Sequence, residues 1–503
     1  MLTKTQSVAN FGLETVGVTV EVNIASKSFP AFSIVGLPNK AIDEAKERVR
    51  TALINSSVKF PQKRITVNLA PADLPKEGSC YDLPIAISIA SLITGLKIPA
   101  KSLFFGELSL NGDLRHTRGA FLAALWAAEN GIDWVFVPAS SANEAVVVDG
   151  IKVFPVESLS QLMLHFYGQE KIIPARNQPP PPAVWKETEF DFADILGQEQ
   201  AKRAMEIAAA GGHNIFLEGS PGAGKTMLSR ALPGILPPLT KKESLEVTKI
   251  YSISGRIPPG GSLITQRPFR APHHTISRVG LIGGGTRPQP GEISLSHRGV
   301  LFMDEMPEFP RSILESLRQP LEDGVVTISR AAGQATFPAR FILVAASNPC
   351  PCGFLHHPKK ACTCTPQEII RYQKRISGPL LDRIDLYVNV PPVRVEKLSV
   401  DKKAARFLEK SEKIRGRVIA ARQRQEKRLG MSNAEMKNKQ IRRFCPLNDG
   451  CEFLLKQAVS QFQLSARGYF RVIKIARTIA DLAGEESISQ NHIAEALQYR
   501  GKR

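Results

Sequence analysis

The feature that most constrains the fold is a glycine-rich loop between an apolar and an amphipathic stretch, NIFLEGSPGAGKTMLSRAL (residues 214–232). A loop of this spacing after a buried strand and before a helix surrounds phosphate oxygens with backbone N–H groups. We expect the lysine to reach the β- and γ-phosphates of ATP and the threonine hydroxyl to bind magnesium. The loop predicts a nucleotide-binding α/β domain, with ATP held by Gly219, Ser220, Pro221, Gly222, Ala223, Gly224, Lys225 and Thr226.

Two further apolar runs end in polar residues that suit hydrolysis of a bound nucleotide. GVLFMDEM ends in Asp304 and Glu305, and FILVAASNPC reaches Asn348. An acid at the end of a buried strand can orient magnesium, and a second acid beside it can deprotonate the attacking water. Asn348 is predicted to hold that water near the γ-phosphate, and an ordinary Asn-Pro turn is the alternative.

Arginines in apolar surroundings are candidates for neutralising the charge that develops during phosphoryl transfer. In SGPLLDRIDL, Arg383 lies between two acids. An arginine from a neighbouring subunit can stabilise the transferred group, and a local ion pair is the structural alternative. In LSARGYFRVIKIARTIADLAG, Arg467 is the second candidate with Arg471 in reserve, and a solvated basic helix face is the alternative.

The charge balance indicates a polyanionic partner. The chain has 503 residues, with 66 Lys and Arg against 47 Asp and Glu, a net charge of +19. Nucleic acid or a membrane surface would match such a surplus. The longest apolar run, LPIAISIASLITGL, is shorter than the roughly 18 to 20 residues that span a bilayer, so it predicts a buried helix. Without a secretory signal, the seven cysteines favour reduced thiols and a cytoplasmic location.

Composition changes along the chain predict its domain organisation. Residues 1–170 alternate between strand-like and helix-like patterns, and residues 171–190 are rich in proline. Four consecutive prolines favour an extended, semi-rigid spacer. Residues 191–393 read as an α/β core, a parallel sheet flanked by helices, and residues 394–503 read as almost wholly helical, typical of a lid.

A group of cysteines suggests a structural metal site. Cys350, Cys352, Cys362 and Cys364 form two Cys-x-Cys pairs in fifteen residues. Four thiolates can bind zinc in a tetrahedral arrangement and leave no open position for catalysis. Thiols packed in a loop without metal are the alternative. A zinc site here would be structural and would hold the two Cys-x-Cys pairs together.

The order of these motifs resembles that of AAA+ ATPases. More specifically, RPFRAPHHT, PGEISLSHRGVLFMDEMPEF, NPCPCG and SGPLLDRIDL resemble the ComM family, also called YifB or magnesium-chelatase-like proteins, over essentially the whole chain. ILGQEQAKRA, which begins at Ile195, resembles the segment that packs on adenine. The resemblance implies a homo-hexameric ATPase ring that acts as a DNA helicase and drives branch migration in natural transformation. It also implies magnesium bound by Thr226 and Asp304, Glu305 as catalytic base, and Asn348, Arg383 and Arg467 around the γ-phosphate.

Two basic segments are candidates for binding DNA without reading its sequence. The stretch 252–298 is predicted to be a flexible loop, and the hairpin 325–343 presents one arginine near its tip. The candidate contacts are Arg267, Arg270, His273, His274, Arg278, Arg287 and Arg330. Solvated loop charges are the alternative for each. The stretch 401–443 adds 15 Lys and Arg against 5 Asp and Glu and is a possible DNA-facing arm. A recombinase and other competence proteins are possible partners.

Two other functions remain open. A magnesium chelatase motor would use the same ATPase core but have less need for the N-terminal 170 residues and the positive charge. The N-terminal region also resembles the Lon-type protease fold, since PKEGSC is similar to its nucleophile loop. In that alignment the nucleophile falls on Cys80 and the lysine base on Phe121. Because Phe121 accepts no proton, we expect this domain to be proteolytically inactive.

Overall fold

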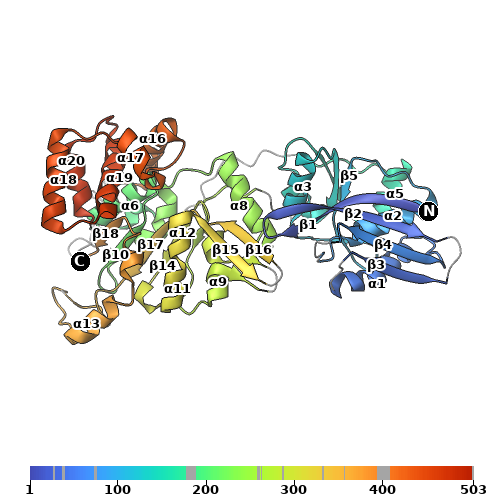
Figure 1. Cartoon of the computed structure of the whole chain (residues 1–503), viewed down its shortest axis with the longest axis horizontal. Helices are drawn as coiled ribbons and strands as arrows, with labels where there is room; N and C mark the ends of the chain where they lie inside the picture. The colour runs from blue at the N-terminus through green and yellow to red at the C-terminus, as the bar shows by residue number, and fades with distance from the viewer. Residues whose placement is uncertain are drawn as a thin grey trace.

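The computed structural model of the chain is elongated, with an N-terminal body, a central body and a helical C-terminal body along its longest axis (Figure 1). It describes residues 1–25, 29–36, 40–72, 76, 78–176, 189–257, 261, 263–285, 288–330, 333–355, 357–393 and 408–500. Most of the proline-rich segment predicted as a linker lies outside these ranges.

The N-terminal body contains a mixed seven-stranded sheet. Its strands, in spatial order, are β3 (Ala31–Val35), β4 (Arg64–Ala70), β2 (Glu14–Ile24), β1 (Leu2–Phe11), β5 (Ser102–Phe104), β8 (Trp134–Pro138) and β9 (Lys152–Val156). Its main helices are α1 (Lys40–Asn55), α2 (Asp82–Thr94), α3 (Ala120–Glu129) and α5 (Leu159–Tyr167). The long apolar run forms α2, which is buried over most of its length, as predicted.

The central body is built on a five-stranded parallel sheet, which confirms the predicted α/β core. Its order is β11 (Phe269–Arg270), β14 (Val300–Met303), β17 (Ile342–Ser347), β10 (Ile215–Glu218) and β18 (Leu386–Asn389). Both faces are apolar: Leu217 and Val344 belong to one hydrophobic cluster, and Phe216 and Leu343 to another. Helices therefore cover the sheet on both sides, as parallel sheets require. They include α6 (Glu199–Gly211), α7 (Lys225–Ala231), α11 (Arg311–Ser316) and α12 (Arg318–Asp323).

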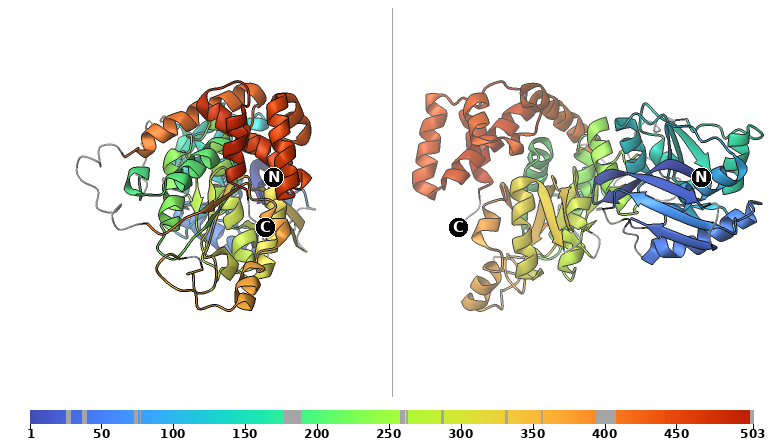
Figure 2. Two further views of the ribbon diagram at one scale, coloured as in Figure 1. Left: turned by 90° about the vertical axis from the view of Figure 1, so that its left-hand side faces the viewer. Right: turned by 45° about the vertical axis from the view of Figure 1, so that its right-hand side comes forward.

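The C-terminal body is helical, as predicted. It contains α16 (Ser411–Leu429), α17 (Asn438–Phe444), α18 (Asp449–Phe462), α19 (Ala466–Ala483) and α20 (Gln490–Gln498). Figure 2 shows these helices packed as a bundle against one end of the central body. Its apolar side chains are continuous with the cluster that contains Leu217, so the lid and one face of the sheet share a core.

The N-terminal body docks on α8 (Lys241–Ile253) and on the hairpin of β15 (Val325–Arg330) and β16 (Gly333–Pro338). The hydroxyl of Ser252 donates to the Glu144 carboxylate at 2.8 Å across this contact. Burial raises the pKa of Glu144 to about 7. On the hairpin side, a Cβ at Gly12 would come within 2.9 Å of the Cβ of Ala335, which shows how closely the two bodies approach.

The stretch 252–298 is more ordered than the predicted flexible loop. Besides β11 it contains α9 (Arg278–Ile282), the strand pair β12 (Gly283–Gly284) and β13 (Gln289–Pro290), and α10 (Glu292–Leu295). The prediction was wrong for these parts because the segment adds an edge strand to the central sheet and packs its helices on one another. Arg287 and the side chain of Arg330 lie outside the described residues.

Candidate functional site

The glycine-rich loop connects β10 to α7, the predicted strand–loop–helix context. Gly222 and Gly224 have φ values of 76° and 91°, a region that favours glycine. A Cβ at Gly219 would lie 2.3 Å from the carbonyl oxygen of Val390, so only glycine fits there. The helix N-terminus and the loop N–H groups together form a site suited to phosphate.

Lys225 is the central cation of this loop. Its ammonium donates to the carbonyl oxygens of Gly219 at 2.6 Å and Ser220 at 3.0 Å, and to Asn348 Oδ1 at 3.1 Å. Burial lowers the pKa of Lys225. The lysine and the asparagine are thus brought together, although 123 residues separate them in the sequence.

Thr226 and Asp304 form a pair of oxygen ligands. The Thr226 hydroxyl donates to Asp304 Oδ2 at 3.0 Å. Asp304 directly follows β14, and Asn348 follows β17, so both lie at carboxyl ends of parallel strands next to the loop after β10. A hydroxyl and a carboxylate are hard oxygen donors of the kind magnesium prefers beside nucleotide phosphates. The donor set therefore fits magnesium.

Glu305 has an unusual backbone conformation. Its φ is 49° and its ψ 45°, in the left-handed region, where non-glycine residues are uncommon. Its N–H donates to Asp304 Oδ1 at 3.0 Å. The Glu305 carboxylate is half-exposed, and its Oε2 lies 4.0 Å from Nδ1 of His274. The sequence indicated His274 only as a DNA contact. Its place beside the candidate base, with its ring against Phe309, comes from the structure.

Arg383 and Arg467 share one acidic partner, Glu322 of α12. Arg383 Nη2 donates to Glu322 and Nη1 to the carbonyl of Pro379 at 2.6 Å. Arg467 Nη2 lies 3.2 Å from the other Glu322 oxygen. The hydrogen bond from Arg383 lowers the pKa of Glu322. Among the described contacts, neither arginine touches the glycine-rich loop or Asp304. Both side chains therefore gather at one place outside the nucleotide site of their own chain.

Asp385, two residues after Arg383, has other partners. Asp385 Oδ2 lies 3.2 Å from His213 Nδ1, and Arg471 lies 3.5 Å from the other Asp385 oxygen. His213 is fully buried, and its Nε2 lies 2.8 Å from the Thr478 hydroxyl on α19. A buried polar network therefore connects the end of α6, the segment after Arg383 and the lid. No motif indicated a role for His213, because its partners are 172 and 265 residues away.

The segment that begins at Ile195 packs beside the nucleotide loop. Ile195 is buried in the core shared with the lid. Gln198 Nε2 donates to the carbonyl oxygens of Ala223 at 3.1 Å and Pro391 at 2.7 Å. Gln198 thus links this segment to the loop. An adenine contact by Ile195 stays a prediction.

The four clustered cysteines converge. The Sγ atoms of Cys350, Cys352, Cys362 and Cys364 all lie within 4.8 Å of one another. Three of the Sγ pairs are separated by 3.4, 3.5 and 3.7 Å. Tetrahedral zinc with Zn–S bonds of about 2.3 Å places sulfurs ~3.8 Å apart, so the donor set fits zinc. His357 accepts hydrogen bonds from the loop backbone at Lys359 and Lys360. His356 lies outside the described residues.

The predicted DNA contacts separate into two groups. Arg267 is mostly buried and donates to the carbonyls of Pro237, Pro238 and Arg298, and Arg270 binds Glu292 through two nitrogens. These placements favour structural roles for both arginines. In contrast, His273 and Arg278 are exposed and available to a ligand.

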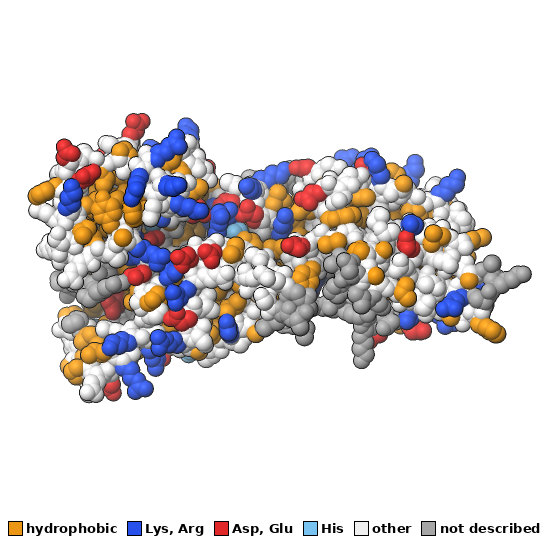
Figure 3. Space-filling model, in the orientation of Figure 1, with side chains coloured by type: hydrophobic (Ala, Val, Ile, Leu, Met, Phe, Trp, Pro, Cys, Tyr) orange, Lys and Arg blue, Asp and Glu red, His pale blue; other side chains and the backbone are white. Residues whose placement is uncertain are grey.

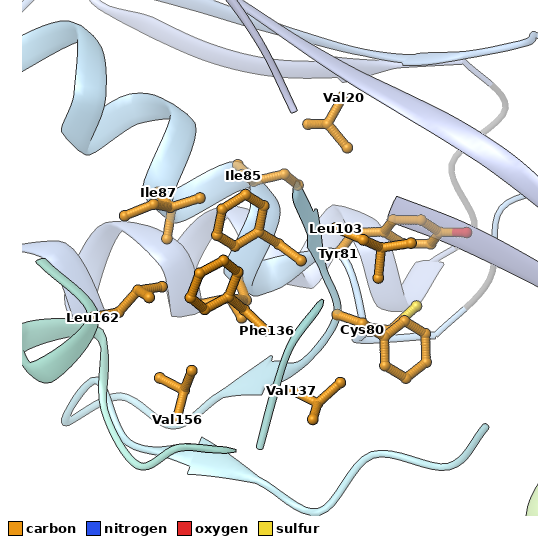
Figure 4. Close-up of a cluster of buried hydrophobic side chains, with 14 of the residues drawn as sticks. Val20, Cys80, Tyr81, Ile85, Ile87, Leu103, Phe136, Val137, Val156 and Leu162 are labelled. Atoms are coloured by element: carbon orange, nitrogen blue, oxygen red, sulfur yellow. The ribbon is translucent and has the colours of Figure 1, made fainter. Parts of the chain in front are cut away.

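Cys80 and Phe121, which align with the nucleophile and the base of a serine–lysine protease, are both buried. Cys80 is buried, and Figure 4 shows it beside Tyr81 at the edge of the apolar cluster that includes Leu103 and Val137. Phe121, at the position where a serine–lysine protease has its base, is fully buried in the same core.

We therefore expect Cys80→Ala to leave ATP hydrolysis within about twofold of the wild type. Removing a buried sulfur should cost on the order of 1 kcal/mol of stability through the small cavity that it leaves. Steady-state ATPase rates and a thermal melt would measure both effects. Loss of any peptidase activity in this variant, with folding intact, would contradict the assignment of an inactive domain.

Family models match most of the chain. The description "Magnesium chelatase, subunit ChlI" matches residues 191–398, "Subunit ChlI of Mg-chelatase" matches residues 20–141, and the ChlI C-terminal model matches residues 408–500. In the described part of the chain, no helix is long and apolar enough to cross a membrane.

Similar proteins cover nearly the full length. "Competence protein ComM" of Haemophilus influenzae is 46% identical over 98% of this chain and 96% of its own length. The Escherichia coli protein YifB is 42% identical over the same shares. The "Magnesium-chelatase 38 kDa subunit" of Rhodobacter capsulatus is 25% identical over 65% of this chain and 93% of its own length. The chain therefore belongs to the ComM/YifB family of magnesium-chelatase-like AAA+ proteins.

Proposed function

We propose that the chain is an ATP-driven DNA translocase that assembles into a hexameric ring and promotes branch migration during homologous recombination and natural transformation. The observation that carries the motor activity is the convergence of Lys225, Thr226, Asp304 and Asn348 at one edge of the parallel sheet. The net charge of +19 and the similarity to a competence protein support DNA as the molecule along which the motor moves. A recombinase is a fitting partner for such a motor.

Each side chain has a distinct role in the proposed reaction. Lys225 leaves its carbonyl partners for the β- and γ-phosphates, and Asn348, now bonded to Lys225, orients the attacking water. Thr226 and Asp304 hold magnesium, which when bound neutralises phosphate charge. Glu305, half-exposed at the rim, removes the proton from the water. His274 Nδ1 lies 4.0 Å from that carboxylate.

The pairing of Arg383 and Arg467 on Glu322 supports a role at the subunit boundary. Both side chains lie together and apart from their own nucleotide loop. In a ring, one subunit's arginines can reach the γ-phosphate held by its neighbour. We propose that both arginines leave Glu322 when a neighbour's ATP arrives.

The decisive test is movement of a three- or four-way DNA junction with ATP and magnesium. We expect the wild type to resolve the junction, and Lys225→Ala to bind DNA without moving it. Fluorescently labelled strands report the products on a native gel. A wild type that hydrolyses ATP but never moves a junction would reject branch migration.

The family models favour one second candidate, a motor of the magnesium chelatase type. DNA dependence of the ATPase distinguishes the two functions. A DNA translocase should hydrolyse ATP several-fold faster with single-stranded or branched DNA. An ATPase indifferent to both DNA forms would favour the chelatase-type motor.

We also propose structural zinc at the four cysteines. Gly353, inside this loop, packs so closely on the nucleotide loop that a Cβ would lie 2.5 Å from Pro221 Cδ. Metal binding would therefore stabilise the cysteine-containing loop that packs against the nucleotide loop. Cys350→Ser or Cys362→Ser should lose bound zinc and lower the melting temperature, while Cys80→Ala keeps the metal. Metal analysis of the purified proteins checks this, and unchanged zinc in either serine variant would reject the site.

A further inference from the structure

The lid carries an open basic depression between the end of α16 and α17. Its volume is about 450 Å³, and it is lined by Lys427, Lys439, Arg443 and Phe444, among others. In Figure 3, blue side chains gather on the upper surface of the lid, over α16 and α17. It is distinct from the nucleotide site, which lies at the carboxyl edge of the central sheet.

Three cations of this depression have no acidic partner within the described chain. Lys427, Lys439 and Arg443 are exposed, and no ion pair is recorded for any of them among the described residues. A fourth lining residue, Arg428, pairs with Asp481 at 2.6 Å, an acid that also pairs with Arg477 at 3.0 Å. The depression therefore presents about three uncompensated positive charges to solvent.

Two acids lie close to these cations in the sequence, Glu426 directly before Lys427 and Glu435 four residues before Lys439. Glu435 accepts from Ser432 and pairs with Arg340 at 3.4 Å. Neither acid lines the depression.

Stabilisation of the helices explains the presence of only two of these three cations. Lys427 lies in the last turn of α16, and Arg443 in the last turn of α17, where cations favour the helix dipole. Lys439 lies in the first turn of α17, where a cation is unfavourable. Its position opposite Lys427 and Arg443 therefore indicates a ligand with negative charge.

We propose that this depression binds phosphate groups of a nucleic-acid backbone, an inference that rests on the proposed DNA translocase function. We expect the contact to be independent of sequence, because three exposed cations in an open depression suit the phosphate oxygens that every nucleotide carries. Phe444 is half-buried, and the Arg443 guanidinium lies 5.1 Å from its ring centre, so the arginine covers one face of this ring. The lid thus supplies a second contact with DNA, separate from the exposed His273 and Arg278.

The test is a triple variant, Lys427→Gln, Lys439→Gln and Arg443→Gln, measured with fluorescently labelled single-stranded DNA over a range of sodium chloride concentrations. We expect the affinity for DNA near physiological salt to fall about tenfold or more. The negative slope of log K against log salt should become shallower by roughly one to two. The matched control changes three cations that are already paired with acids, Lys4→Gln, Lys413→Gln and Lys456→Gln. Its affinity should stay within about twofold of the wild type, although its net charge is lowered equally.

The outcomes separate this inference from the proposed function. If the wild type binds no DNA, the DNA translocase proposal itself fails. If the wild type binds DNA and the triple variant matches the control, the depression is not a DNA contact. Competition with inorganic phosphate at constant ionic strength distinguishes a site for the phosphates of a nucleic-acid backbone from a site for free phosphate. If phosphate protects the wild type but not the triple variant from thermal unfolding, and DNA affinity is unchanged, the site takes a free anion and the inference is overturned.

Discussion

Glu305→Gln should bind ATP with nearly wild-type affinity and hydrolyse it at least about 100-fold more slowly, the usual contribution of a general base. The amide keeps the size and the hydrogen-bonding reach of the carboxylate but does not accept the proton of the attacking water. The proposed magnesium ligands are Thr226 and Asp304, which this substitution leaves in place, so magnesium binding should survive. Single-turnover hydrolysis and binding of a fluorescent ATP analogue measure the two effects separately.

The matched control is Glu308→Gln, three residues further along the same loop. Glu308 is partly exposed and pairs with Arg375 at 2.6 Å, so its replacement should leave hydrolysis within about twofold of the wild type. Lys225→Ala should differ from both variants, because it removes the cation that contacts the phosphates and weakens ATP binding itself. Normal turnover in Glu305→Gln would show that another group, with His274 the nearest candidate, takes the proton.

The convergence of the candidate nucleotide-binding residues could be predicted because each motif carries its own local context. The loop at Gly219–Thr226 contains its strand and helix, and Asp304 and Asn348 each follow an apolar strand. Carboxyl ends of neighbouring parallel strands meet at one edge of a sheet, so separate motifs converge without further information. The same reasoning explains why the parallel core and the helical lid were correctly expected.

The partners of isolated charges were not predictable. Glu322 is 61 residues from Arg383 and 145 from Arg467, and its own surroundings in the sequence are ordinary. Arg267 was expected to face DNA because its segment is basic and rich in glycine. The fold instead brings the carbonyls of Pro237 and Arg298 to its guanidinium. Composition does not distinguish an arginine that fills a gap between loops from one that faces solvent.

Arg383→Ala should reduce ATP hydrolysis by about 1,000-fold or more while leaving ATP binding intact, as expected for an arginine that acts from a neighbouring subunit. Arg375→Ala is the control, since Arg375 lies eight residues earlier and is half-exposed in a pair with Glu308. It should hydrolyse ATP within about twofold of the wild-type rate. Steady-state ATPase rates measured at saturating ATP compare the two variants.

Mixing two inactive variants tests whether Arg383 acts on its neighbour's ATP. A Glu305→Gln subunit still offers its arginine, and an Arg383→Ala subunit still offers its base, so one arrangement of the two restores a complete site. With random assembly of equal amounts, about a quarter of the interfaces should be complete, and hydrolysis should rise well above that of either variant alone. If Arg383 served its own nucleotide, no mixture would contain a complete site and the rate would stay at the level of the separate variants. Arg383 and Arg467 share Glu322, and none of their described contacts is with Lys225, which is the structural reason to expect restoration.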